Sequence, residues 1–239
     1  MASRPLVLGH RGASAVVPEN TVAAFTRARE LGADGVELDV RRTADGVLVV
    51  HHDAAVKGFG LIASATLAEL RAACPDVATL AAALEACRGL VVNAEVKCLS
   101  WEPDADVDGS VMHATIDALR AHAETVDEGM IIVSSFDLGA VDRARAQAPE
   151  LATGWLTNGQ ALAAAAEIAV AHGHPWLNPD GVAALAAGAD GIGAAHAAGV
   201  LVSVWTVDDP DAARALAAAG VDIIITNVPD VVLEAVSRE

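Results

Sequence analysis

Two acidic residues in one strand-like segment are the first candidates for chemistry. Glu37 and Asp39 stand two positions apart, between the apolar residues Val36, Leu38 and Val40. Side chains two apart on a strand point to the same face, so the two carboxylates would lie side by side. Such a pair repels and loses hydration unless a cation lies between its members. A hard divalent cation meets this need, and a pair of salt-bridged acids is the alternative.

The same spacing recurs at Asn93, Glu95 and Lys97, which again places polar groups on one face of a strand. Glu95 could complete a metal site with Glu37 and Asp39. Lys97 could hold a phosphoryl oxygen as a point charge. An internal ion pair between Glu95 and Lys97 is the competing interpretation of this second segment.

Two histidines stand at the ends of strand-like segments. His10 and Arg11 end the first segment, and His52 follows the apolar run Val47–His51. In a barrel of parallel strands, active sites lie at the carboxyl ends of the strands. We therefore expect two histidines, three carboxylates, an arginine and a lysine to converge at one end of a sheet, where packing alone explains them poorly.

The elements that must hold these residues alternate regularly along the chain. Short runs rich in β-branched residues follow helix-like stretches that end in glycine, as at Gly32, Gly199 and Gly220. Glycine past a helix end adopts the left-handed cap conformation without steric cost. This order is typical of an α/β protein with a parallel sheet. The predicted strands are Leu6–His10, Val36–Arg41, Val47–His51, Leu90–Lys97, Met130–Phe136, Thr153–Leu156, Trp176–Asn178, Leu201–Val207 and Asp222–Thr226.

These strands are one more than a closed (β/α)8 barrel needs. The connection between Val40 and Val47 is too short for a crossover helix, and its Asp45-Gly46 dipeptide is a hairpin signal. We therefore expect Val47–His51 to fold back antiparallel on the second strand and to bring His52 beside Asp39. The other eight strands fit a (β/α)8 barrel, and a doubly wound α/β sheet is the alternative.

Length and charge restrict the class of protein further. The 239 residues suit one barrel domain, expected over residues 1–239. The net charge of −17 argues against nucleic acid and anionic membranes as partners, so an anionic substrate would need local cations. No apolar run approaches about 18 residues and no signal peptide precedes the first strand, so we expect neither a membrane span nor export. The odd number of cysteines, without metal-site spacing, is typical of reduced thiols in a cytoplasm.

Other motifs are absent or weak. The sequence lacks a Gly-x-Ser-x-Gly elbow, a Gly-x-Gly-x-x-Gly turn and a P-loop, which disfavours serine hydrolases and nucleotide-dependent enzymes. His172 and His174 have a spacing that could suit a metal, but we expect a solvated loop there. His113, His122 and His196 are expected on helix surfaces.

The chemistry-bearing segments resemble those of the glycerophosphodiester phosphodiesterase family. They run in family order across nearly the whole chain, and jointly they are very specific although each alone is weak. The matching segments are His10-Arg11-Gly12, Pro18-Glu19-Asn20-Thr21, Glu37-Leu38-Asp39-Val40, the Thr43–Gly46 turn, His52-Asp53, Glu95-Val96-Lys97, Ser134-Ser135-Phe136, Trp205-Thr206-Val207, and Thr226-Asn227 followed by Pro229.

The resemblance implies a (β/α)8 barrel that hydrolyses small glycerophosphodiesters to glycerol 3-phosphate and an alcohol. It implies that Mg²⁺ or Ca²⁺ is held by the three carboxylates Glu37, Asp39 and Glu95. It further implies that His10 and His52 form the general acid–base pair and that Arg11 and Lys97 bind the phosphate. We expect Phe136 and Trp205 to line the non-ionic part of the substrate, with a role as core aromatics as the alternative.

One segment departs from the family pattern. After His52-Asp53, family members usually continue with Leu-x-Arg-Thr-Thr and a longer insertion over the active site, whereas Ala54–Leu67 is short and made mostly of small residues. We therefore expect a barrel with a hairpin extension after the second strand and a shortened cap. The departure affects the expected substrate more than the expected chemistry.

Several alternatives stay open from the sequence. A lipid-directed phosphodiesterase of the lysophospholipase D or phospholipase C kind could use the same barrel, although no basic amphipathic helix favours it. A non-catalytic barrel that binds a phosphate metabolite is a rival of another class, but binding alone does not need a paired acid and base. The attacking oxygen could belong to water or to the glycerol 2-hydroxyl, and either histidine could be the base.

Overall fold

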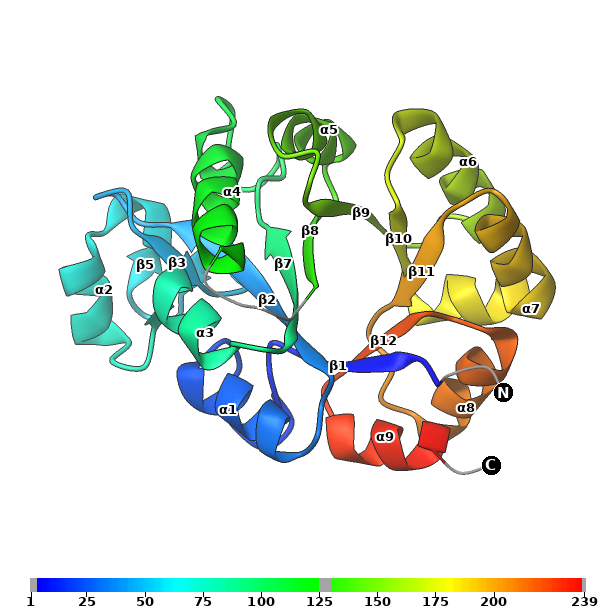
Figure 1. Ribbon diagram of the computed structural model, residues 1–239. Coiled ribbons are helices and arrows are strands. Elements are labelled where there is room, and N and C mark those ends of the chain that lie inside the picture. The colour runs from blue at the N-terminus through cyan, green and yellow to red at the C-terminus, as the bar shows by residue number, and fades with distance from the viewer. Residues whose placement is uncertain (1–3, 125–129, 238–239) are drawn as a thin grey trace.

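A computed structural model describes residues 4–124 and 130–237, and its central feature is a closed barrel of parallel strands (Figure 1). Each barrel strand pairs with the next along the chain, and β12 pairs with β1 to close the sheet. The predicted (β/α)8 barrel is confirmed. The barrel strands are β1 (Leu6–His10), β2 (Gly35–Arg42), β7 (Val91–Val96), β8 (Ile131–Ser135), β9 (Ala152–Thr157), β10 (Trp176–Pro179), β11 (Leu201–Val204) and β12 (Ile223–Thr226).

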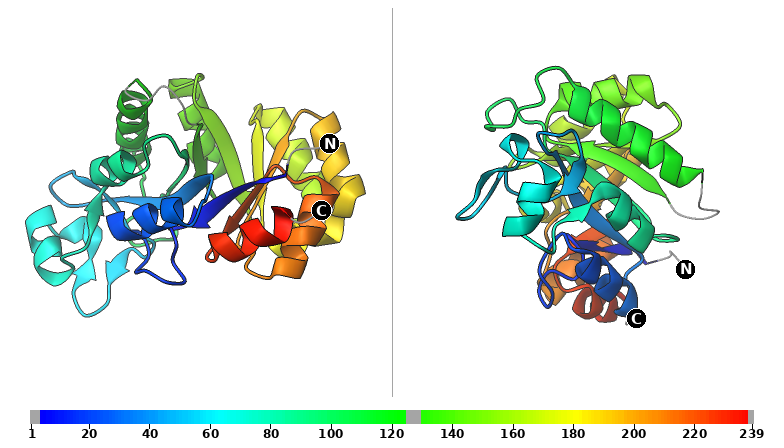
Figure 2. Two further views of the ribbon diagram at one scale, coloured as in Figure 1. Left: turned by 60° about the horizontal axis from the view of Figure 1, so that its bottom comes forward. Right: turned by 90° about the vertical axis from the view of Figure 1, so that its left-hand side faces the viewer.

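Helices surround the barrel, and Figure 2 shows the same arrangement from two further directions. No helix in the described residues is both long and apolar enough to cross a membrane. The helices are α1 (Val22–Glu30), α2 (Leu67–Ala73), α3 (Leu80–Ala86), α4 (Ser110–Ala123), α5 (Leu138–Gln147), α6 (Leu162–His172), α7 (Gly181–Ala197), α8 (Pro210–Ala219) and α9 (Pro229–Ser237).

The inside of the barrel changes from apolar to polar along its axis. Leu8, Ile132 and Ile223 belong to a buried cluster at the level where the strands begin. Two positions further along their strands, His10 and Ser134 point to the same inner face. The apolar layer therefore closes the amino end of the barrel, and the polar layer lies at its carboxyl end.

The predicted hairpin after the second barrel strand is confirmed. Strand β3 (Leu48–Val50) pairs antiparallel with β2, with Val40 opposite Val50. The turn between them contains Gly46, whose φ of +83° is the left-handed conformation that glycine adopts readily. The backbone N–H of His51 then donates to the carbonyl of Asp39 at 2.9 Å, so the return strand reaches the carboxyl end of β2.

The segment after the hairpin has more structure than the sequence indicated. A second small hairpin, β4 (Ala55–Val56) with β5 (Gly60–Leu61), leads into a 3₁₀ turn (Ile62–Ser64) and α2. Strand β6 (Ala78–Thr79) then extends the sheet beside β3. Apolar residues of β3, the 3₁₀ turn and α2 form a separate small core, so this insertion packs on its own beside β2.

Two local expectations were wrong. The predicted strand Leu201–Val207 ends at Val204, because the backbone leaves the sheet toward the N-cap of α8 at Asp209. The stretch with His172 and His174 is not a solvated loop. His172 ends α6, and His174 is 2% exposed. His174 is buried because β10 begins two residues later, so the backbone here already lies at the amino end of the barrel.

Candidate active site

Cross-strand register places most of the predicted site residues side by side. His10 on β1 lies opposite Glu37 on β2, and Asp39 on β2 lies opposite Glu95 on β7. Lys97 directly follows β7. Because alternate side chains share a face, these residues line the carboxyl end of the barrel from three neighbouring strands. Barrel enzymes carry their active sites at that end.

Glu37, Asp39 and Glu95 form one carboxylate cluster. One oxygen of each lies within 4.8 Å of the others, and all three residues are buried. Burial raises the pKa of Glu37 well above its ordinary value, and the charges of Asp39 and Glu95 raise it further. Burial also raises the pKa of Glu95, to about 7. Lost hydration and repulsion between the carboxylates therefore favour the protonated forms of the two glutamates.

Two cations lie against the carboxylate cluster. Lys97 Nζ is 2.9 Å from Asp39 Oδ1 and 2.5 Å from Glu95 Oε1. Arg11 Nε is 3.3 Å from Asp39 Oδ2, and the Arg11 backbone N–H donates to Glu37 Oε2 at 3.0 Å. Burial alone would raise the pKa of Asp39, but Lys97 and Arg11 outweigh it and lower that pKa to about 2. Asp39 is therefore ionised at neutral pH.

The donor set of the carboxylate cluster fits a hard divalent cation. When ionised, the three carboxylates carry one more charge than Lys97 and Arg11 offset. Oxygen Oε1 of Glu37 is buried and accepts no hydrogen bond from any residue that the structure describes. A buried carboxylate oxygen without a donor is costly, and a metal ion would satisfy it. Ligands that are all oxygen suit Mg²⁺ or Ca²⁺.

Hydrogen bonds define the tautomer of His10. Its Nδ1 lies 2.7 Å from Asn227 Oδ1, and the Asn227 amide nitrogen donates to Asp208 Oδ2 at 2.7 Å. Because a carboxylate only accepts, Asp208 turns the amide oxygen of Asn227 toward His10. Nδ1 of the neutral His10 ring therefore carries the proton, and Nε2 has a free lone pair. Burial, assisted by Arg11, lowers the pKa of His10 and favours this neutral form.

His52 lies where the hairpin returns to the barrel mouth. Its Nδ1 is 2.7 Å from Asp53 Oδ1, and its side chain is 37% exposed, compared with 17% for His10. His52 is close enough to Asp39 to contribute to the lowered pKa of that carboxyl, after the larger effects of Lys97 and Arg11. The hairpin thus brings His52 to the Asp39 side of the carboxylate cluster, as predicted from the Asp45-Gly46 turn.

Asn20 is a buried residue of the site that sequence reasoning missed. Its amide nitrogen donates to Asp39 Oδ2 at 2.7 Å, and its amide oxygen accepts from the Asp39 backbone N–H at 3.3 Å. Its φ of +56° is left-handed, a conformation that asparagine tolerates better than most residues. The signal was present in Pro18-Glu19-Asn20-Thr21, which matched the family without a role being assigned to the amide.

Arg41 is a second residue that was missed. Its Nε and Nη2 donate to the His52 carbonyl at 2.8 and 2.6 Å, and its Nη1 lies 2.7 Å from Asp104 and 3.1 Å from Glu102. The side chain is almost fully buried. Arg41 continues the two-residue alternation of Glu37 and Asp39, so the spacing that found the acids could also have found it. It joins the His52 segment to the loop after β7.

The two predicted aromatic residues meet at the barrel mouth. The rings of Phe136 and Trp205 are 5.4 Å apart and nearly perpendicular, and the Trp205 indole N–H donates to the carbonyl of Asn178 at 2.9 Å. Trp205 lines a small cavity together with His10, Glu37 and Glu95, whereas Phe136 does not. Trp205 therefore borders the site directly, and Phe136 packs against it in a T-shaped pair.

The fold defines a class, the (β/α)8 barrels, and in this chain the carboxyl end of the barrel carries buried carboxylates and two histidines. A model of the Glycerophosphoryl diester phosphodiesterase family matches residues 10–231. The chain therefore belongs to this family of phosphoric diester hydrolases. It is 33% identical to a glycerophosphodiester phosphodiesterase of Caldanaerobacter subterraneus subsp. tengcongensis, over 98% of this chain and 99% of that protein.

Solved structures agree with this family. An Oleispira antarctica phosphodiesterase in complex with its product sn-glycerol-3-phosphate superposes with a TM-score of 0.84 and 26% identity, over 98% of each chain. A glycerophosphodiester phosphodiesterase of Thermotoga maritima superposes with a TM-score of 0.78 and 28% identity, over 100% of each chain. Both similarities extend over the whole barrel.

Proposed function

We propose that this chain hydrolyses glycerophosphodiesters to glycerol 3-phosphate and an alcohol in a reaction that depends on a divalent metal. The observation that carries the proposal is the carboxylate cluster. Within the described ranges its buried Glu37 Oε1 has no hydrogen-bond donor, and His10 Nε2 lies 3.9 Å from Oε2 of the same carboxylate. The product seen in the Oleispira antarctica structure supports the choice of substrate class.

In this proposal Glu37, Asp39 and Glu95 hold Mg²⁺ or Ca²⁺. The bound ion would act as a Lewis acid and offset charge that develops on the phosphoryl group. Lys97 and Arg11, which both contact Asp39, add two positive charges beside the cluster that orient the anionic phosphodiester. The protein as a whole is strongly acidic and the carboxylates outnumber these two cations, so the bound ion together with Lys97 and Arg11 would make the mouth of the barrel receptive to an anion.

We assign the two proton transfers from the hydrogen bonds of the rings. His10 takes the proton from the attacking oxygen, because Asn227 leaves its Nε2 with a free lone pair. His52 gives a proton to the departing alkoxide from Nε2, because its Nδ1 N–H donates to the carboxylate of Asp53, which orients the ring. The bond between phosphorus and the alcohol oxygen breaks as the new phosphorus–oxygen bond forms.

An assay of the purified enzyme tests the proposed function directly. Protein stripped with a chelator and then supplied with Mg²⁺ or Ca²⁺ would be given glycerophosphocholine, glycerophosphoethanolamine and lysophosphatidylcholine, with release of glycerol 3-phosphate measured. We expect metal-dependent release from the first two substrates. Equal activity with and without chelator would contradict the role of the metal, and no release from any substrate would contradict the function.

A lipid-directed activity is supported by a different observation. Trp101 and Val107 are 77% and 94% exposed in the loop after β7, and Phe59 is exposed on the β4–β5 hairpin. Both segments follow strands whose carboxyl ends form the site, so large apolar side chains stand near the mouth. If lysophosphatidylcholine were the better substrate in the assay above, these residues would be the first to contact its acyl chain.

Removing the amide of Asn227 should lower kcat about 10- to 100-fold without unfolding the protein. This loss is smaller than the rate effect of removing the base itself, which is about 10²- to 10⁴-fold. The Asn227→Leu variant can no longer hold Nδ1 of His10, so the ring samples the unproductive tautomer. Ser14→Ala is the matched control, since Ser14 donates to the same amide oxygen at 2.7 Å but does not touch His10. A kcat for Asn227→Leu equal to that of the control would show that the amide does not position the base, and the pH profile of kcat reports the same change independently.

Discrimination among leaving alcohols should be weak. Lys97 and Arg11 meet the phosphoryl group that every substrate carries, and the cap segment Ala54–Thr66 offers few side chains that could hydrogen-bond a particular alcohol. Buried polar contacts give large discrimination, whereas apolar contacts give only about 1–3 kcal/mol. We therefore expect similar kcat/KM for choline, ethanolamine and glycerol as leaving groups. A preference above about a thousandfold, or about 4 kcal/mol, would mean that another loop, such as Cys98–Asp108, reads the alcohol.

A further inference from the structure

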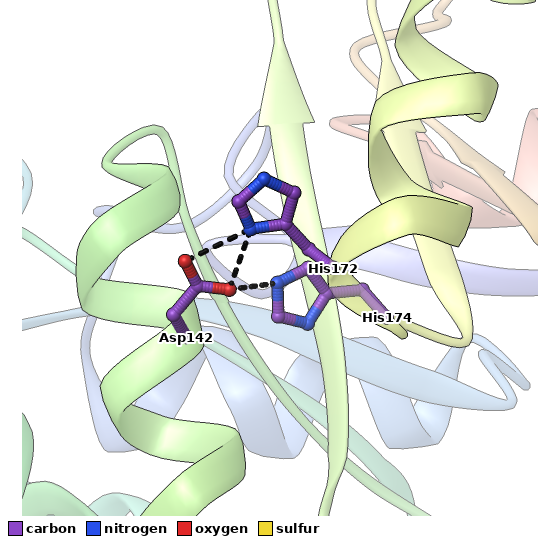
Figure 3. A group of neighbouring side chains, drawn as sticks. All are labelled: Asp142, His172 and His174. Atoms are coloured by element: carbon purple, nitrogen blue, oxygen red, sulfur yellow. Dashed lines mark hydrogen bonds and ion pairs between the residues drawn. The ribbon is translucent and has the colours of Figure 1, made fainter.

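Two histidines and an aspartate meet on the outside of the barrel, away from the active site. Asp142 lies on α5, His172 is the last residue of α6, and His174 stands two residues later, just before β10 begins. Figure 3 shows that both rings turn toward the Asp142 carboxylate. Because the segment between α6 and β10 enters the amino end of a barrel strand, this group lies at the end opposite the carboxylate cluster.

The donor atoms of this group point at one another. His172 Nδ1 is 2.9 Å from Asp142 Oδ2, and His174 Nε2 is 3.0 Å from Asp142 Oδ1. One donor atom from each residue lies within 4.8 Å of the other two. The two rings are nearly parallel, with 19° between their planes and 6.2 Å between their centres. A single carboxylate therefore faces two imidazole nitrogens from two different elements.

The buried histidine has the surroundings of a metal ligand. His174 is 2% exposed, and its Nδ1 lies 3.0 Å from the hydroxyl of buried Thr153. A histidine that binds a metal through one nitrogen usually donates its other N–H to an oxygen, which sets the tautomer and the ring orientation. Without an ion, Nε2–H donates to the Asp142 carboxylate and Nδ1 accepts from the Thr153 hydroxyl. The Thr153 oxygen can equally accept from Nδ1–H, and in that tautomer the lone pair of Nε2 is free for a cation between the ring and Asp142.

We propose that Asp142, His172 and His174 bind one divalent transition-metal ion of the Zn²⁺ type. Two imidazoles and one carboxylate are the ligands that such borderline ions prefer, whereas Mg²⁺ and Ca²⁺ prefer oxygen alone. The chain thus carries two cation sites of different chemistry, an all-oxygen site inside the carboxyl end and a nitrogen-rich site outside the amino end. The second site does not depend on the proposed catalytic function.

Binding requires only a small movement of the ligands. In a tetrahedral zinc site with bonds of about 2.0–2.1 Å, neighbouring ligand atoms are about 3.3 Å apart. The two histidine–aspartate separations here are a few tenths of an ångström shorter, and one nitrogen of each ring lies within 4.8 Å of the other. The side chains of Asp142 and His172 are 40% and 38% exposed, so both are free to move and a water molecule can reach the fourth position. His174 supplies the fixed ligand of the three.

A bound ion would connect two neighbouring units of the barrel. Asp142 belongs to the helix after β8, and the histidines belong to the connection from α6 to β10. The amino end of such barrels serves stability, and catalysis takes place at the other end. We therefore expect Zn²⁺ to raise the melting temperature and to leave kcat with saturating Mg²⁺ unchanged. Arg145 packs against Gly173, the residue that separates His172 from His174 in the sequence. Its positive charge lies near the site and would weaken binding of the ion.

The test measures Zn²⁺ binding to the full-length protein in excess Mg²⁺, which occupies the all-oxygen site. Calorimetry and metal analysis after gel filtration should give one Zn²⁺ per chain, and Glu37→Gln should keep that ion. His172→Ala and Asp142→Asn should abolish it and the rise in melting temperature. His196→Ala is the matched control, because His196 pairs with Asp222 at 2.8 Å by the same chemistry but with one imidazole only.

Two milder substitutions guard against loss of folding. Thr153→Val keeps the shape of the buried residue but removes the acceptor for His174, and should weaken Zn²⁺ about 10- to 100-fold, the usual effect of losing such a partner. Arg145→Gln should bind Zn²⁺ more tightly than the unchanged protein. No saturable Zn²⁺ binding by the unchanged protein, or full binding by His172→Ala, would overturn the proposal and leave an ordinary histidine–aspartate cluster.

Discussion

Replacing either His10 or His52 with alanine should lower kcat about 10²- to 10⁴-fold, the usual value of one positioned proton transfer. The carboxylates proposed to hold the metal are untouched by both changes, so metal binding should stay the same. His113→Ala, at an exposed position on α4, is the control for a histidine that takes no part in the reaction. Steady-state kinetics with glycerophosphocholine, calorimetry of Mg²⁺ or Ca²⁺ binding and circular dichroism check the three parts of this prediction.

The double variant separates catalysis from positioning. Because the base and the acid act on one transition state, removing the second should cost far less than removing the first, and the losses should be strongly non-additive. The two rings also differ in surroundings, since His10 is held by Asn227 and His52 by Asp53. Two small losses that add would mean that both histidines only orient the substrate.

The Glu37→Gln variant should lose both metal affinity and turnover, with kcat/KM falling at least about 100-fold. Glutamine has the same shape and can still accept the Arg11 backbone N–H, but it removes one anionic ligand from the carboxylate cluster. Titration of the stripped protein with Mg²⁺ or Ca²⁺, followed by activity in the same samples, measures both effects. A variant that keeps full activity in chelator would refute the metal-dependent reaction.

The stability of the same variant gives a second, independent readout. The pKa of Glu37 is raised in the folded state, chiefly by burial, so the folded protein binds this proton more tightly than the unfolded chain does. The contribution is fully present below the unfolded value of about 4.3 and is lost as pH rises toward the folded value. At neutral pH the metal-free Glu37→Gln protein should therefore melt no lower than the unchanged protein. A large loss of stability would indicate that the ionised carboxylate is satisfied by protein groups alone.

The parts of the site that could be predicted are those set by the period of a strand. Glu37 with Asp39, and Glu95 with Lys97, share faces because alternate residues do, and Asp45-Gly46 defined the hairpin that returns His52. The insertion around α2 could not be predicted in the same way. Its small core joins short segments whose pairing depends on contacts beyond any local pattern.

The residues that hold the reactive groups were harder to find. Asn227, Asp208 and Asn20 act through amide and carboxylate hydrogen bonds across the fold, and such partners leave no spacing in the sequence. The segments that contain Asn227 and Asn20 matched the family, yet a match does not say which atom faces which ring. The burial of His174 was missed for a related reason. A His-Gly-His-Pro stretch is typical of an exposed turn, and its contact with Thr153 on the neighbouring strand cannot be read from the local sequence.

The hydrogen bond between His10 and Asn227 joins residues 217 positions apart, across the seam where β12 meets β1. Contacts between such distant parts of a chain form late in folding, because the entropy of closing so long a loop must be overcome before they contribute. The proposed metal ligands Glu37, Asp39 and Glu95 come from β2 and β7, which pair in the barrel and are much closer in sequence than His10 and Asn227. During folding the chain would therefore gain the ability to hold a metal before it gains an oriented base, and reactivity would begin only when the ring of strands is complete.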